Sequence, residues 1–196
     1  AGEGPIVIPQ PSYAEYRHVL TNLHGREVLP FYTDESDFIL DVDALVKFAK
    51  VSKASAICLV NPCNPTGFAL PKDKMIRLLD SIGHMSIVVD ETYIDYIGKG
   101  NSIESSVEQY PNLMVLKSVY KFYALSGMRI GYAVAAVSVA KQFQIETPPY
   151  IVSTPGQMAA IAAFEAEDYY LDRVEETHRL REGFSGKLRS LPGLRV

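Results

Sequence analysis

Short apolar runs alternate with amphipathic segments along the whole chain. The apolar runs are rich in β-branched residues, which predicts strands at residues 5–9, 27–31, 56–60, 86–90, 113–117 and 128–135. The other segments repeat apolar positions at helical spacing, which predicts helices at 12–23, 41–51, 71–82 and 169–191, and from 138 onward with a break at 147–150. Asp41 stands where an N-cap residue is expected, before the second of these helices.

Strands that are apolar throughout and separated by helices favour a mainly parallel sheet that is covered on both faces. We therefore predict an α/β fold with three αβα layers, in which residues 1–196 form one large domain. Residues 169–196 would begin the helix that leads to a further, smaller domain. In such sheets ligands bind at the carboxyl ends of the strands.

The composition excludes several classes of function. The formal net charge is −4 and the pI is near 5.6, which argues against a nucleic-acid partner or an anionic membrane. No apolar run is long enough to span a bilayer, and the first residues lack a signal-peptide pattern. Cys58 and Cys63 are best interpreted as reduced thiols, which predicts a cytoplasmic protein. The four histidines show no ligand spacing, so no metal site is predicted.

Two polar segments follow predicted strands directly. NPCNPTG at 61–67 contains Asn64 in a run of turn-forming residues, and taken alone it is as well explained by a sharp loop. VVDETY at 88–93 places Asp90 at the end of an apolar strand, with Tyr93 three residues later. A buried carboxylate is costly unless it is paired, although Asp90 could also cap the next helix.

A third segment, KSVYKFYALSGMRIGY at 117–132, contains Lys121 just after a buried strand, with Ser118 before it and Arg129 eight residues later. Desolvation among aromatic and small residues could remove the charge of Lys121, as a Schiff-base nucleophile requires. The alternative is a surface lysine whose stem lies along apolar groups.

Together and in this order, the three segments resemble the fold-type I, pyridoxal-phosphate (PLP)-dependent aminotransferases of class I/II. The resemblance is closest to the histidinol-phosphate aminotransferase branch, and it extends over PSYAEY, LDVDAL, NPCNPTG, DETYIDY, the lysine segment and VSTPGQMAA at 152–160.

The resemblance implies three catalytic residues. Lys121 would form the Schiff base with PLP and then act as general base and acid. Asp90 would face the pyridine nitrogen and keep it protonated, so that the ring accepts electrons. Tyr93 would hydrogen-bond the phenolic oxygen of the cofactor.

The same resemblance implies the remaining cofactor contacts. Asn64 would share the phenolic oxygen with Tyr93, and Tyr13 would stack on the pyridine ring. Ser118 and Arg129 would hold the phosphate, the arginine because its planar fork matches phosphate oxygens.

Two positions depart from the pattern of the family. Tyr120 replaces the small hydroxyl residue that often precedes the lysine and helps to bind phosphate, so we expect a lower phosphate affinity. Thr92 replaces a common alanine, and we expect this change to be harmless.

Length is a further departure. The chain lacks the glycine-containing phosphate loop, the N-terminal arm and the small domain with its carboxylate-binding arginine. The sequence therefore predicts a fragment truncated at both ends, which alone binds PLP weakly and shows no turnover.

The resemblance implies transamination in amino-acid biosynthesis, between a small-molecule amino donor such as histidinol phosphate and a 2-oxo acid acceptor. It also implies a homodimer for the full-length parent. Two alternatives stay open. One is a lyase like the threonine-phosphate decarboxylases, which share the scaffold and resemble residues 121–132 equally well. The other is a non-catalytic cofactor-binding module in which Lys121 can be changed without consequence.

Overall fold

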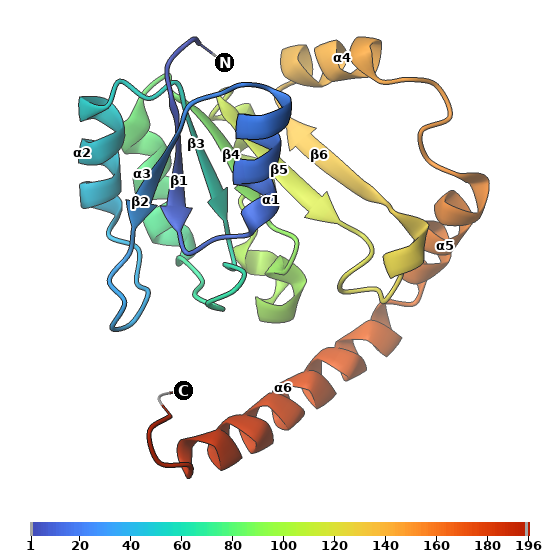
Figure 1. Cartoon of the computed structure of the whole chain (residues 1–196). Helices are drawn as coiled ribbons and strands as arrows, with labels where there is room; N and C mark the ends of the chain where they lie inside the picture. Colours follow the sequence, from blue (N-terminus) through green and yellow to red (C-terminus); the bar gives the residue numbers. More distant parts are fainter. Residues whose placement is uncertain (1, 195) are drawn as a thin grey trace.

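A six-stranded sheet forms the centre of the molecule (Figure 1). The structure is a computed structural model and describes residues 2–194 and 196. The strand order is β2-β1-β3-β4-β5-β6, and all neighbours are parallel except β6, which runs antiparallel to β5. The strands are β1 (Ile6–Gln10), β2 (Val28–Tyr32), β3 (Ala56–Val60), β4 (Ser86–Asp90), β5 (Leu113–Ser118) and β6 (Gly131–Ala135).

Helices lie on both sides of this sheet, which confirms the predicted α/β class. They are α1 (Ala14–His18), continued by a π-helical turn over Val19–Leu23, α2 (Val42–Val51), α3 (Lys72–Ile82), α4 (Val137–Glu146), α5 (Thr154–Glu165) and α6 (Glu167–Arg189). Within the described residues, no helix is long and apolar enough to cross a membrane. The division into a large domain and the start of a smaller one stays a prediction.

The main core lies between one face of the sheet and helices α2 and α3. Val7, Ile57 and Val89 point into it from three adjacent strands, and Leu45 of α2 and Leu78 of α3 cover them, all fully buried. The predicted cap is confirmed, since Asp41 Oδ1 accepts from the Ala44 amide at 3.0 Å. This core fixes the order of β1, β3 and β4, and with it the relative positions of their carboxyl ends.

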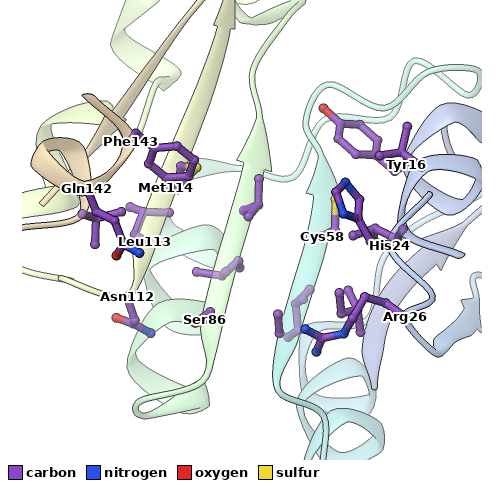
Figure 2. Close-up of a pocket in the computed structure, with 18 of the residues that line it drawn as sticks. Tyr16, His24, Arg26, Cys58, Ser86, Asn112, Leu113, Met114, Gln142 and Phe143 are labelled. Carbon is purple, nitrogen blue, oxygen red and sulfur yellow. The ribbon is translucent and has the colours of Figure 1, made fainter. Parts of the chain in front are cut away.

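The opposite face is covered less completely. Tyr16 and Leu20, from α1 and the π-helical turn, pack on a small cluster that includes Cys58. A groove of about 960 Å³ separates this side from α4. Figure 2 shows Tyr16 and Cys58 on one wall of the groove and Met114 and Phe143 on the other.

The chain after β5 forms its own cluster with α5 and α6. Val119, Tyr123 and Ile130 are buried against the inner face of α5, and the Tyr170 hydroxyl of α6 donates to the Tyr123 carbonyl at 3.2 Å. Gly156 of α5 packs closely on this cluster, because a Cβ there would lie 3.0 Å from the Ile130 side chain. The VSTPGQMAA segment therefore braces the turn that contains Lys121.

One predicted boundary is wrong in a way that matters for the site. The apolar run at 128–135 suggested a strand from residue 128, but β6 begins at Gly131. Ser126–Met128 forms a 3-10 turn, and Arg129 takes a left-handed conformation with φ 54°. A non-glycine residue rarely adopts this conformation, and here it reverses the chain just before β6.

Candidate active site

The seven residues singled out from the sequence all line one pocket of about 320 Å³. The pocket lies at the carboxyl ends of β3, β4 and β5, where the parallel sheet favours ligand binding. Its volume falls at the lower end of the range of about 300–1,000 Å³ typical of small-molecule sites. The residues are Tyr13, Asn64, Asp90, Tyr93, Ser118, Lys121 and Arg129. The structure brings all of them together; their roles stay predictions.

Asp90 is buried at the end of β4, with an exposed fraction of 7%. Its Oδ2 accepts from the Tyr16 hydroxyl at 2.5 Å, and its Oδ1 accepts from the Thr92 hydroxyl at 2.5 Å and the Thr92 amide at 2.8 Å. A carboxylate offers about four lone-pair directions, so these three bonds leave room for one further donor. Asp90 thus stabilises the turn that directly follows β4, and it also lines the pocket.

Tyr16 is a member of this site that the sequence analysis missed. Burial, followed by the charge of Asp90 and the hydrogen bond to it, raises the pKa of the Tyr16 phenol well above its ordinary value. The phenol therefore stays protonated and donates to Asp90 at neutral pH. The sequence feature that could have identified Tyr16 is its position in PSYAEY, one helical turn after Tyr13.

The Asn-Pro loop contains two asparagines with different tasks. Asn61 is buried, and it closes the loop by accepting from the Leu70 amide at 2.7 Å and donating to the Leu70 carbonyl at 3.3 Å. Asn64 is partly exposed and lines the pocket. The turn interpretation of this segment is confirmed for Asn61, while the cofactor-binding role of Asn64 stays a prediction.

Lys121 follows β5 in the turn that leads to Arg129, and its side chain is exposed. The expectation that Lys121 is desolvated is therefore wrong, because the surrounding aromatic residues pack on α5 and α6 instead. The Tyr120 ring contacts both cations, with its centroid 4.7 Å from the Arg129 Cζ and 5.5 Å from the Lys121 Nζ. Such cation–π contacts orient both side chains over the pocket.

Ser118 and Tyr13 also line the pocket. Ser118 is buried at the end of β5, with its hydroxyl 3.4 Å from the Tyr120 amide, a weak contact that leaves the hydroxyl free to act on a ligand. Tyr13 is 47% exposed and meets the Tyr16 ring edge-on at 6.2 Å. An exposed aromatic ring at a pocket rim is suited to stacking on a flat ligand.

Comparison with known proteins agrees with this geometry. The family model for aminotransferase class I and II matches residues 1–196. The chain belongs to the class I and II aminotransferase family. A histidinol-phosphate aminotransferase from Ruminiclostridium cellulolyticum is 26% identical over 191 residues, which cover 97% of this chain and 53% of that protein.

Two solved structures of such aminotransferases share the fold. The histidinol-phosphate aminotransferase from Clostridium acetobutylicum has a TM-score of 0.89 at 25% identity, over 98% of this chain and 58% of that one. The Sinorhizobium meliloti enzyme, in complex with pyridoxal-5'-phosphate, has a TM-score of 0.83 at 23% identity, over 91% and 48%. The chain thus spans about half the length of the aminotransferases that it matches.

Proposed function

We propose that the protein is a PLP-dependent aminotransferase, which moves an amino group between a histidinol-phosphate-like amino donor and a 2-oxo acid acceptor. The observation that carries the proposal is the convergence of Asp90 with Lys121 and Arg129 on one pocket, from two separate segments of a family member. Neither the buried carboxylate nor the two cations stabilise the apolar core, so their common location points to a ligand.

The residues of the pocket fit PLP group by group. The open lone pair of Asp90 matches a protonated ring nitrogen, the amine of Lys121 matches an aldehyde, and Arg129 with Ser118 matches a phosphate. Within the described residues, no group of three or more His, Cys, Asp and Glu could hold a metal instead. When bound, PLP supplies an aldehyde that condenses with amines and a ring that withdraws electrons from the substrate.

The chain's own residues would then perform distinct tasks. Asp90, held by Tyr16 and Thr92, would keep a negative charge beside the ring nitrogen. Lys121 Nζ would take a proton from the substrate α-carbon and deliver it to the cofactor carbon. Tyr93 and Asn64 would donate to the phenolic oxygen of the cofactor, and Tyr13 would cover its ring.

The wider setting follows from the same proposal. The substrates would be small molecules, and the activity would serve amino-acid biosynthesis in the cytoplasm. The parent would act as a homodimer. A decarboxylase on the same scaffold is the alternative, since both reactions use the same cofactor contacts and differ in which bond to the substrate α-carbon is aligned with the π-system of the ring.

Amine transfer tests the proposal directly. The protein, expressed from its full reading frame and supplied with PLP, should convert 2-oxoglutarate to glutamate when histidinol phosphate is the donor. The parallel assay offers threonine phosphate and measures released carbon dioxide. Release of carbon dioxide without glutamate formation would favour the lyase, and no reaction of PLP with the protein would contradict both enzymes.

Tyr120 gives a second prediction. Its ring lies against the Arg129 guanidinium, where a smaller hydroxyl residue could instead reach a phosphate. We expect Tyr120→Ser to bind PLP several-fold more tightly, by roughly the 0.5–1.5 kcal/mol of one added hydrogen bond. The measurement is a titration of PLP absorbance. Tyr120→Phe is the control that keeps the ring and removes only the hydroxyl. An equal gain in affinity in both variants would show that the hydroxyl of Tyr120, not the bulk of its ring, limits PLP affinity.

A further inference from the structure

A buried ion pair that the proposed chemistry does not use lies directly behind the pocket. The Lys117 Nζ is 2.9 Å from the Glu91 Oε2, and the two side chains are 8% and 0% exposed. Ser102 donates to the same Glu91 oxygen at 2.5 Å, and the Ile103 amide donates to the other at 2.9 Å. Glu104 approaches Lys117 to 3.4 Å. Every oxygen of the buried carboxylate is thus engaged.

Each member of the pair is the chain neighbour of a pocket residue. Glu91 follows Asp90 at the end of β4, and Lys117 precedes Ser118 in β5. The Glu91 amide donates to the Leu116 carbonyl at 2.9 Å, so the strand pairing continues through this point. Successive side chains of a strand point to opposite faces. Asp90 and Ser118 therefore face the pocket, while the side chains of Glu91 and Lys117 meet on the other face of the sheet, although Lys117 is also among the residues that line the pocket.

The lysine of the pair is held in its charged form. Burial alone lowers the pKa of Lys117, but the hydrogen bond to Glu91 and the charges of Glu91 and Glu104 outweigh burial, and the net result is a raised pKa. A lysine with a raised pKa stays charged at and below the ordinary lysine pKa, so Lys117 keeps its positive charge across the neutral range. Buried ion pairs are often no more stabilising than apolar residues of the same size, so stability alone does not account for this one.

We propose that Glu91 and Lys117 are positioning residues, whose pair sets the spacing between the strand ends that carry Asp90 and Ser118. The inference rests on the proposed function, because this spacing matters only if both strand ends act on one bound molecule. A displacement of about 1 Å in a catalytic arrangement can lower the rate by about 100-fold, so a rigid tie at this place has a large effect.

The test is the double variant Glu91→Gln/Lys117→Met, which removes both charges and keeps the volume. It is made in the protein expressed from its full reading frame. The matched control, Asp43→Asn/Arg77→Met, removes an exposed ion pair whose Arg77 Nη2 and Asp43 Oδ2 are 2.5 Å apart on the α2–α3 surface. Three quantities are measured well below the melting temperature: the PLP dissociation constant without substrate, kcat and KM.

We expect the Glu91→Gln/Lys117→Met variant to remain folded, to bind PLP more weakly and to lose about 100-fold in kcat with little change in KM. The control should match the unaltered protein in all three. Unchanged PLP affinity and kcat in the folded double variant would overturn the inference and leave the proposed function intact. If the unaltered protein itself fails to bind PLP, both the inference and the proposed function are wrong.

A second variant decides the question if the double variant does not fold. Glu91→Asp keeps both charges but withdraws the carboxylate by one methylene, so the strand ends must shift to restore the contact with Lys117. We expect weaker PLP binding and lower kcat in this variant, and Lys117→Arg, which keeps charge and reach, should stay closer to the unaltered protein. Full affinity and full kcat in Glu91→Asp would overturn the positioning role.

Discussion

Replacing Asp90 with asparagine should lower turnover by about 10²–10³-fold, the usual cost of losing one preorganised electrostatic partner. The substitution keeps the size of the side chain but removes the charge that Tyr16 and Thr92 hold in place at the end of β4. The ring nitrogen of the cofactor would then lose its proton, and the ring would withdraw fewer electrons. Capture of PLP by Lys121 should persist, because the aldehyde end is untouched.

The measurement compares kcat and PLP capture in Asp90→Asn with those in a matched control. Asp80→Asn is suitable, because Asp80 also accepts from a tyrosine, with the Tyr110 hydroxyl at 2.7 Å, but on an exposed surface away from the pocket. The control should keep its turnover. Near-normal turnover in Asp90→Asn would mean that Asp90 serves only its own turn after β4.

Replacing Lys121 with alanine should remove both covalent capture of PLP and proton transfer. General acid–base catalysis alone contributes about 10²–10⁴-fold, so turnover should fall by at least that factor. Non-covalent binding of PLP should survive in part, since Ser118, Arg129 and Asp90 remain. The assay is glutamate formation together with the visible absorbance of the bound cofactor.

Lys141→Ala is the control for this substitution. Lys141 is exposed on α4, away from the pocket, so its loss should change neither absorbance nor rate. Unchanged PLP binding in Lys121→Ala, together with no glutamate formation by the unaltered protein, would support the remaining alternative of a non-catalytic cofactor-binding module. Full turnover in Lys121→Ala would contradict the catalytic role of Lys121.

Local patterns predicted most of the fold. The strands at 56–60 and 86–90 and the helix at 41–51 match the structure within one residue, because burial on a sheet or a helix leaves a short-range period in the sequence. The three motifs at strand ends predicted the pocket, because parallel strands present their carboxyl ends at one edge of the sheet.

Contacts between distant residues could not be predicted in this way. Tyr16 and Asp90 are 74 positions apart, and Glu91 and Lys117 are 26 apart, so only the strand order brings each pair together. The exposure of Lys121 depends on how its aromatic neighbours pack against α5 and α6, and no local period records that choice. Thr92, whose replacement of alanine was expected to be harmless, likewise acquires a role through a contact, because its hydroxyl donates to Asp90.

Mapping the lysine that captures PLP tests the central claim most directly. The protein, expressed from its full reading frame, is incubated with PLP, reduced with borohydride, digested and analysed by mass spectrometry. We expect the cofactor on Lys121, because that amine is exposed at the pocket, while the Lys117 amine is bound to Glu91 and buried. Cofactor found on Lys117 or Lys141, with Lys121 unmodified, would contradict the account.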